Sequence, residues 1–223
     1  MSDLDFDAYK SLSKVLYSAV LSDVLDSMGL PNQTMRPFVR PLSEDDVLFG
    51  PARTGLFMPR YGLIDDENPY DIEIALIDDL RKGDVPVFAC GGPVETITPW
   101  GELLTTAATM RGACGFVTDG LVRDARAIKK AGFPVFHGGI RPLDSAGRSK
   151  MMLRDTAVEC AGVRIEPGDI VFGDIDGVVV LPGARASEAI ERAEKKINGE
   201  NKTRAEILAG SKLADIYNKY GIL

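Results

Sequence analysis

Helical patterns lie near both ends of the chain. Between residues 11 and 28 apolar side chains return every three or four positions and Gly29 follows them, which predicts a helix that ends at this glycine. After Pro182-Gly183, residues 184–209 are rich in Glu, Lys and Arg and predict a second, long helix. A solvated helix and an arm that reaches a neighbouring subunit would show the same pattern there.

Short apolar runs alternate with helical patterns in the middle of the chain. Strands are predicted at 50–60, 85–90, 115–118 and 133–136, and helices at 71–82, 101–111 and 123–131. This alternation is typical of β-α units around a mostly parallel sheet. From residue 156 the pattern changes, and strand candidates punctuated by Gly, Pro and Asp predict antiparallel hairpins at 156–160, 163–165, 170–173 and 177–181.

No repeat, low-complexity tract or Ser/Gly linker divides the sequence. We therefore expect a single domain over residues 1–223, with a helical N-terminal arm (1–30) and a helical C-terminal tail (184–223). The composition, 45% hydrophobic and 26% charged, is that of an ordinary globular protein. The first ten residues lack an apolar core and no apolar run approaches the roughly 18 residues of a membrane span, so we expect a cytoplasmic protein.

The charge balance and the cysteines argue against several classes of function. Lys and Arg number 26 against 33 Asp and Glu, and the net charge of -7 disfavours binding to nucleic acids and anionic membranes but leaves room for a small anion at a local site. Cys90, Cys114 and Cys160 are odd in number and form no Cys-x-x-Cys pair, which argues against a disulfide framework or a structural zinc site. With a single histidine, any metal must rest on carboxylates and water.

The spacing from Gly101 to Asp124 brings two helix starts together. A helix that begins near Gly101 runs away for about three turns, at about 1.5 Å per residue, and the strand at 115–118 leads the chain back. The next helix, which Arg123 and Asp124 open, therefore begins close to Gly101. This is the carboxyl edge of a parallel sheet, where ligands commonly bind.

Each group at this edge suits a chemical task. The free N–H groups of Gly101, Glu102, Leu103 and Leu104 would bind a carboxylate, and Gly101 lets it approach the backbone closely. Arg123 supplies a permanent cation with a planar fork for a carboxylate or keto oxygen. Asp124 supplies a hard oxygen ligand for Mg²⁺ or Mn²⁺, and Glu102 could accept a hydrogen bond from a water on that metal.

Structural explanations compete with these roles. An acidic residue at a helix start can serve only the helix dipole, and ion pairs at helix ends are common. Asp119-Gly120 is expected to form a turn, and Asp174 and Asp176 are expected to cap hairpins rather than bind metal. His137 could be an acid or base near neutral pH, although a pocket-lining or capping role is favoured.

Motifs of other site classes are absent from the sequence. It has no Gly-x-x-x-x-Gly-Lys phosphate loop, no Gly-x-Gly-x-x-Gly and no Gly-x-Ser-x-Gly elbow. No lysine is placed convincingly for a Schiff base.

The chain resembles the RraA-like family in three segments: WGELLTTAATMRGACGFVTDGLVRD at 100–124, GFPVF at 132–136 and VRIEPGDIVFGDIDGVVVLP at 163–182. The combination of Gly-Glu, Arg-Asp and Pro-Gly-Asp…Asp-Gly-Val-Val-Val is far more specific than any one piece. The similarity extends from about residue 11 to the C-terminal tail. The enzyme branch of this family consists of the 4-hydroxy-4-methyl-2-oxoglutarate (HMG) and 4-carboxy-4-hydroxy-2-oxoadipate (CHA) aldolases.

The resemblance implies both a fold and a reaction. The fold is a compact α/β/β sandwich of the swivelling-domain type, assembled as homotrimers or homohexamers with active sites at subunit interfaces. The reaction is cleavage of a 4-hydroxy-2-oxo dicarboxylic or tricarboxylic acid to pyruvate and a second oxo acid, with decarboxylation of oxaloacetate in some members. It requires a divalent metal, Mg²⁺ first and Mn²⁺ or Co²⁺ as alternatives, and no Schiff base.

The resemblance also assigns roles to residues. Residues 101–104 would hold the pyruvyl carboxylate, Arg123 would bind the keto oxygen and stabilise the enolate, and Asp124 would hold the metal. An acidic residue from a neighbour's C-terminal helix also reaches the metal site in the aldolases. Glu200 is the best match, with Glu194 and Glu206 nearby.

Two departures from the aldolase pattern concern the substrate. The position three residues after Asp124 tends to be acidic in the aldolases and is Ala127 here. The loop around His137 also differs. The family further contains regulators that bind ribonuclease E and need no catalysis, which gives the alternative function.

Overall fold

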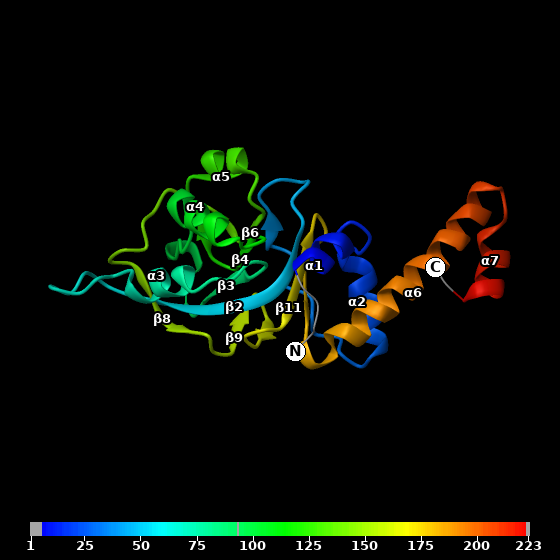
Figure 1. The fold of residues 1–223 in the computed structure, drawn as a ribbon, viewed down its shortest axis with the longest axis horizontal. Coiled ribbons are helices and arrows are strands. Elements are labelled where there is room, and N and C mark those ends of the chain that lie inside the picture. Colours follow the sequence, from blue (N-terminus) through cyan, green and yellow to red (C-terminus); the bar gives the residue numbers. More distant parts are fainter. Residues whose placement is uncertain (1–5, 93, 222–223) are drawn as a thin grey trace.

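A sheet of mixed direction organises the molecule, seen in Figure 1 in a computed structural model that describes residues 6–92 and 94–221. Its central strands run parallel: β2 (Leu48–Pro59), β3 (Val85–Cys90), β4 (Phe116–Thr118) and β6 (Val135–His137). Antiparallel strands flank them: β1 (Arg40–Pro41), β8 (Ser149–Arg154), β11 (Ile170–Asp174) and β12 (Gly177–Leu181). The predicted parallel core and the predicted hairpin of β11 and β12 are both present.

The two faces of the sheet are covered by different elements. Helices α3 (Asp71–Asp78), α4 (Glu102–Arg111) and α5 (Ala125–Ala131) lie on one face, and the hairpin of β9 (Val158–Cys160) and β10 (Val163–Ile165) lies on the other. Successive side chains of a strand point to opposite faces. Phe88 of β3 accordingly packs under the helices, whereas its neighbours Val87 and Ala89 pack toward the hairpin. The expected α/β/β fold class is confirmed.

The terminal helices form a separate apolar layer beyond β11 and β12. Helices α1 (Phe6–Leu12), α2 (Ser18–Ser27) and α6 (Ala186–Leu208) pack there, after a short 3₁₀ turn at Gly183–Arg185. The prediction of one helix over 11–28 is wrong, because the chain is extended at Tyr17 (φ -144°, ψ 155°) and a new helix starts at Ser18. Asp174 fixes this start from β11: its carboxylate accepts the Ser18 N–H at 2.8 Å and the Ser18 hydroxyl at 2.7 Å.

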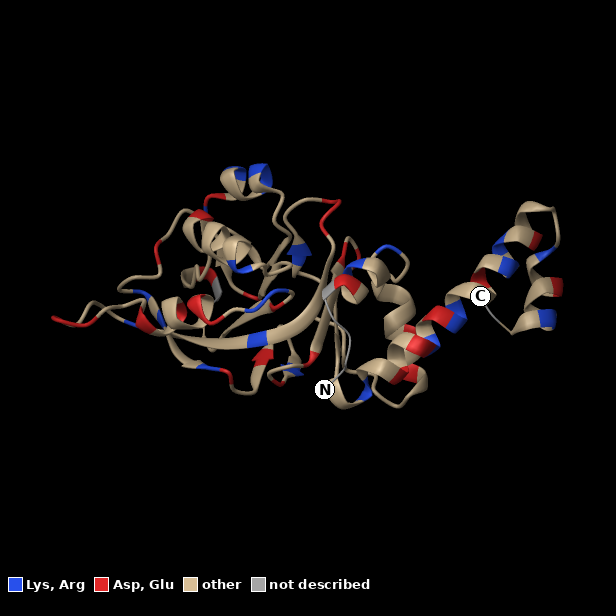
Figure 2. Ribbon diagram, viewed as in Figure 1, with Lys and Arg blue, Asp and Glu red and all other residues tan. Residues whose placement is uncertain are grey.

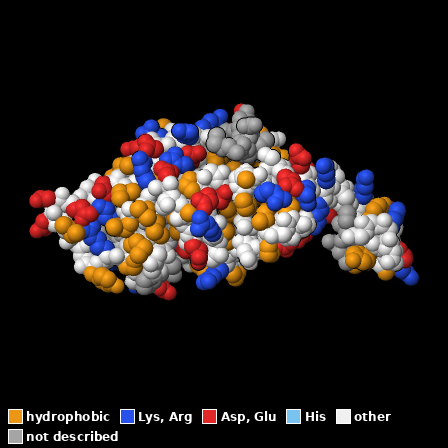
Figure 3. All heavy atoms as spheres, turned by 90° about the horizontal axis from the view of Figure 1, so that it is seen from below, with side chains coloured by type: hydrophobic (Ala, Val, Ile, Leu, Met, Phe, Trp, Pro, Cys, Tyr) orange, Lys and Arg blue, Asp and Glu red, His pale blue; other side chains and the backbone are white. Residues whose placement is uncertain are grey.

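The C-terminal helices extend away from the sheet. Figure 2 shows acidic and basic residues interspersed along α6, where Glu188 pairs with Arg185 at 2.8 Å and with Arg192 at 2.6 Å. Helix α7 (Leu213–Tyr220) packs against α6, and Figure 3 shows the chain projecting at this end. On the face seen in Figure 3, hydrophobic side chains lie in patches among charges of both signs. Within the described residues, no helix is long and apolar enough to cross a membrane.

Two small strands mark the edge of the sheet at which the site lies. β5 (Leu121–Val122) and β7 (Gly139–Ile140) pair in parallel, and a 3₁₀ turn at Val94–Thr96 precedes them. Asp119, expected to serve a turn, is buried before β5, and its two carboxylate oxygens accept the N–H groups of Cys90 and Ala161 at 2.9 and 3.0 Å. This carboxylate therefore ties the end of β3 to the β9–β10 hairpin.

Candidate active site

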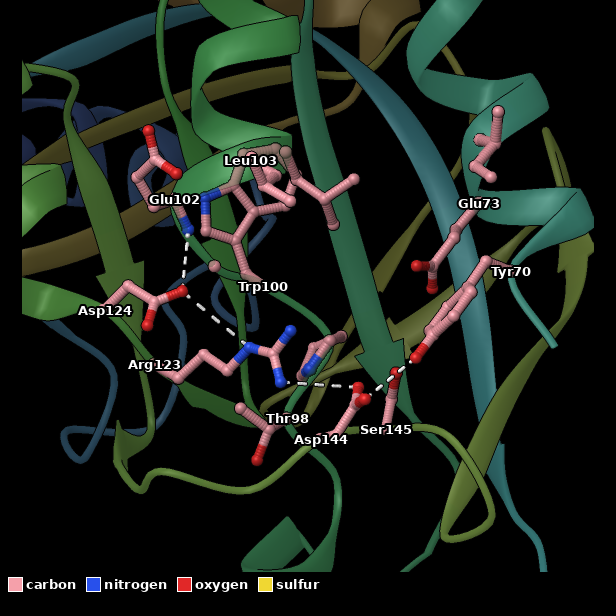
Figure 4. A pocket seen from close by; sticks show the side chains of 14 residues that line it. Tyr70, Glu73, Thr98, Trp100, Glu102, Leu103, Arg123, Asp124, Asp144 and Ser145 are labelled. Carbon is pink, nitrogen blue, oxygen red and sulfur yellow. Dashed lines mark hydrogen bonds and ion pairs between the residues drawn. The ribbon is translucent and has the colours of Figure 1, made fainter. Parts of the chain in front are cut away.

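A cavity of about 400 Å³ opens where the start of α4 meets the segment that leads into α5. Four stretches of chain form its walls: residues 98–104, Arg123-Asp124, the loop residues Asp144 and Ser145, and the first turn of α3 with Tyr70 before it. Figure 4 shows these side chains converging from both sides of the cavity. All six residues singled out in the sequence, Gly101, Glu102, Leu103, Leu104, Arg123 and Asp124, line it.

Backbone pairing brings residues 100 and 123 together. Trp100 forms a parallel bridge with Val122, and the Arg123 N–H donates to the Trp100 carbonyl at 3.0 Å. The Trp100 ring stacks on Phe116 with ring centroids 3.8 Å apart, and its indole N–H donates to Thr105 at 2.8 Å. The core therefore fixes the floor of the cavity.

Gly101 occupies a position where a side chain does not fit. A Cβ at this residue would lie 2.9 Å from Oδ2 of Asp124 and 3.2 Å from Nε of Arg123. Its φ of -154° is open to any residue, so the reason for glycine is the close approach and not the backbone angle. The absence of a Cβ lets both charged side chains reach the start of α4.

Asp124 links the two helix starts. It precedes α5 with a positive φ of 59°, and Oδ2 accepts the backbone N–H of Glu102 at 3.2 Å while lying 3.8 Å from Nε of Arg123. The prediction that residues 101–104 all offer free amides is wrong at Glu102, because its N–H already donates to Asp124. Within the described part of the chain, the amides of Leu103 and Leu104 have no acceptor, so the start of α4 still offers donors to an anion.

Arg123 is held from its other side by an interaction that the sequence did not predict. Its Nη1 lies 3.4 Å from Oδ1 of Asp144, and the Tyr70 hydroxyl donates to Oδ2 of Asp144 at 2.9 Å. Burial, together with this hydrogen bond, raises the pKa of Tyr70 to about 12. Tyr70 therefore stays protonated, keeps Asp144 in place and lets it orient the guanidinium.

Glu73 is a second residue that the sequence-based prediction did not include. It is 5% exposed, and burial, followed by the nearby charge of Asp144, raises its pKa to about 8. A signal existed in the sequence, because Glu73, Leu76 and Ile77 share one face of a helix at i, i+3 and i+4. An acid at a core-facing position of an amphipathic helix predicts a buried carboxyl group.

The remaining candidates lie elsewhere. His137 does not line this cavity, and burial lowers its pKa to about 4, which disfavours acid–base chemistry at neutral pH. Asp174 caps α2 and also accepts the N–H of Asp176, as expected of a structural acid. In its own chain, Glu200 accepts the Tyr17 hydroxyl and Glu206 pairs with Lys219 at 2.7 Å. A role for Glu194, Glu200 or Glu206 in a neighbour's site remains a prediction.

The donor set suits one hard cation better than a multidentate metal centre. In the ranges that the structure covers, no three His, Cys, Asp or Glu side chains gather into a metal cluster. The Asp124 side chain is 48% exposed, and its Oδ1 accepts no hydrogen bond from the described residues. A single half-exposed carboxylate fits Mg²⁺ or Mn²⁺, because such ions are commonly held by one or two carboxylates and several waters.

Comparisons with known proteins identify the class. Residues 18–180 match the family model described as RraA-like, Aldolase/RraA. A protein of Halalkalibacterium halodurans named "Putative 4-hydroxy-4-methyl-2-oxoglutarate aldolase" is 32% identical over 196 residues, which are 88% of this chain and 86% of that protein. Protein DlpA of Legionella pneumophila is 31% identical over 91% of this chain, which spans only 32% of DlpA.

A solved structure gives the same result. RraAS2 of Streptomyces coelicolor, described as an unusual member of the RNase ES inhibitor RraA protein family, superposes with a TM-score of 0.78. It is 27% identical, and the match covers 92% of this chain and 98% of that one. The chain therefore belongs to the RraA-like family, within which some relatives are named as aldolases and others as regulators.

Proposed function

We propose that this protein is a divalent-metal-dependent aldolase that releases pyruvate from a 4-hydroxy-2-oxo dicarboxylic or tricarboxylic acid. The observation that carries the proposal is the convergence of Arg123, Asp124 and the start of α4 on one cavity. The names of relatives at 32% identity support the same chemistry. No lysine lines the cavity among the described residues, so the proposal involves no Schiff base.

The reaction breaks one bond and moves one proton. The C4 hydroxyl loses its proton, the C3–C4 bond breaks, and C4 becomes the carbonyl carbon of the second oxo acid. The electron pair of that bond moves onto the pyruvyl half as an enolate, which takes up a proton at C3 to give pyruvate. The enolate oxygen carries the developing charge, and an enzyme accelerates this step by stabilising that charge.

The chain's own residues cover each requirement of this reaction. The amides of Leu103 and Leu104 bind the carboxylate at C1, and the Arg123 guanidinium donates to the keto oxygen and follows it as it becomes an enolate. Asp144 keeps the guanidinium aimed at the cavity. We assign transfer of the C4 hydroxyl proton to Glu102, through a water molecule.

Asp124 is the residue that we assign to a metal ion. Mg²⁺, Mn²⁺ or Co²⁺ held there would supply a Lewis acid beside the developing negative charge. The same arrangement would serve oxaloacetate decarboxylation, because loss of CO₂ from that substrate also leaves the pyruvate enolate. Homotrimers or homohexamers, in which Glu200 of one subunit reaches the site of the next, complete the proposal.

Pyruvate release coupled to lactate dehydrogenase tests this function directly. HMG, CHA and oxaloacetate are supplied with Mg²⁺, with and without EDTA, to the wild-type protein and to Asp124→Ala. We expect turnover that EDTA and the substitution both abolish. Turnover that survives both treatments contradicts the metal-dependent mechanism.

Regulation of a ribonuclease is the second candidate, and the likeness to RraAS2 favours it. A regulator would bind its partner through its surface and would not need the charged cavity. A pull-down with ribonuclease E that Asp124→Ala leaves unchanged would support regulation, and the absence of a complex would count against it.

A further inference from the structure

The wall of the cavity opposite Asp124 contains a buried carboxyl group without a partner. Glu73 is 5% exposed, and its Oε2 has no hydrogen-bond partner among the described residues. Figure 4 shows the carboxyl group pointing from α3 into the cavity, across from Glu102 and Asp124. Thr98 lines the same cavity, and its hydroxyl is also buried and without a partner in the described chain.

Such groups are rare in a folded interior. Burying a polar group without a hydrogen bond destabilises a fold, and most buried polar side-chain atoms are paired. Two unpaired groups at one cavity point to a ligand that completes their hydrogen bonds. The roles assigned so far, at residues 101–104, 123 and 124, use neither of them.

The surroundings of Glu73 define which ligand group it accepts. Of the described side chains that line the cavity, Arg123 is the only cation, and the proposed function commits it to the keto oxygen. Ile74 and Leu103 add apolar surface to the lining of the cavity. The raised pKa of Glu73 leaves its carboxyl group neutral at pH 7, so it carries an O–H donor. An O–H donor to a carboxylate oxygen makes a short, charge-assisted hydrogen bond.

We propose that Glu73 is the specificity-determining residue for the part of the substrate beyond C3, and that its buried, unpartnered carboxyl group donates a hydrogen bond to the distal carboxylate. This inference rests on the proposed function and deepens it. The pyruvyl end binds at α4 and Arg123, and the leaving half lies against α3. A neutral donor lets this wall receive a second carboxylate without a second cation.

The test separates the two ends of the site. The variants are Glu73→Ala, which removes the donor, and Glu73→Gln, which keeps a neutral donor of the same size. Asp78→Asn is the matched control, because Asp78 lies on the same helix in an exposed pair with Arg111, 3.1 Å apart. The probes are HMG as substrate and oxalate as inhibitor, since oxalate resembles the pyruvate enolate and has no distal half.

We expect Glu73→Ala to raise KM for HMG about tenfold or more, the effect of losing a charge-assisted hydrogen bond. The Ki of oxalate should stay within about twofold, and Glu73→Gln and Asp78→Asn should remain close to wild type. An unchanged KM in Glu73→Ala, or an equal rise in the Ki of oxalate, overturns the inference while the aldolase proposal stands. A wild-type protein that releases no pyruvate from any substrate overturns both.

Discussion

The backbone nitrogen of Glu102 donates a 3.2 Å hydrogen bond to Oδ2 of Asp124, a residue 22 positions away in the sequence. This bond joins the starts of α4 and α5, so the proposed carboxylate-binding amides and the proposed metal ligand form one rigid unit. A substitution at the start of α4 should therefore affect metal binding at Asp124, and a substitution of Asp124 should affect carboxylate binding at α4.

Replacing Asp124 tests the proposed metal ligand. Asp124→Asn keeps the size of the side chain and an acceptor for the Glu102 amide but removes the charge. We expect Mg²⁺ binding, measured by titration calorimetry, to be lost and pyruvate release to fall by about two orders of magnitude or more. The thermal midpoint should change little, because the side chain is 48% exposed. Retention of Mg²⁺ affinity in Asp124→Asn would place the metal elsewhere.

Gly101→Ala tests the close approach at the start of α4. The added methyl group would lie 2.9 Å from Asp124 and 3.2 Å from Arg123, so one of these side chains must move. Misplacing a catalytic group by about 1 Å can reduce the rate about a hundredfold. We expect a large loss of kcat in the coupled assay, whereas Met110→Ala, at an exposed position of the same helix, should be neutral. Wild-type kinetics in Gly101→Ala would show that the approach is irrelevant to catalysis.

Asp144→Asn tests the orientation of Arg123. The substitution removes the negative charge 3.4 Å from the guanidinium and weakens the acceptor for Tyr70. We expect kcat/KM to fall about tenfold, because an exposed ion pair positions Arg123 but makes no contact with the substrate. Tyr70→Phe, which acts on Arg123 only through Asp144, should show a smaller loss. A larger effect from Tyr70→Phe than from Asp144→Asn would contradict this order.

Glu73 should make the protein less stable in alkali. Its pKa is about 8 in the folded protein against 4.5 for a free glutamate, so between these values the unfolded chain releases a proton that the folded chain retains. The resulting stabilisation is complete below about pH 4.5 and is lost as the pH rises toward 8. Since one pKa unit corresponds to about 1.4 kcal/mol, the loss amounts to a few kcal/mol.

Urea unfolding at pH 5, 7 and 9 measures this effect. The free energy of unfolding of the wild type should decline across the series relative to Glu73→Gln, which has no proton to lose. Parallel pH profiles of the two proteins would show that Glu73 ionises normally in the folded state. The charged groups that set its pKa besides burial are Asp144, Arg123 and Asp71.

His137 should have the opposite effect, in acid. Burial lowers its folded pKa to about 4 from an ordinary value of 6.5, and Lys129 adds to the shift. Between pH 6.5 and 4 the unfolded chain binds a proton at His137 and the folded chain does not. The free energy of unfolding therefore decreases as the pH falls. His137→Gln should remove about 3 kcal/mol of this acid dependence in urea unfolding, with no change in pyruvate release. A loss of activity would reopen a role for His137 in the reaction.

The sequence predicted the part of the site that is built from one continuous stretch. Gly101, Arg123 and Asp124 belong to a helix–strand–helix unit whose lengths alone bring its two helix starts together. Tyr70 and Asp144 could not be found in this way, because they lie outside the periodic segments and reach Arg123 only through tertiary packing. Glu73 was detectable from its helical face, but an acid among apolar residues is easily assigned to the solvated side.

The terminal helices show the same limit. Apolar spacing over 11–28 predicts one helix, yet the extended backbone at Tyr17 divides it. The acceptor that starts the second helix is Asp174, 156 residues later. A cap provided from so far along the chain leaves no local signal.

Trp100 gives the protein a built-in optical probe. It is the single tryptophan of the chain, it is 1% exposed, and it lines the cavity next to Gly101. Its fluorescence should therefore be emitted at short wavelength and resist quenching by acrylamide, and it should respond when oxalate or a substrate enters. Affinities for inactive variants become measurable by simple titration in a cuvette, with no label attached and no turnover required.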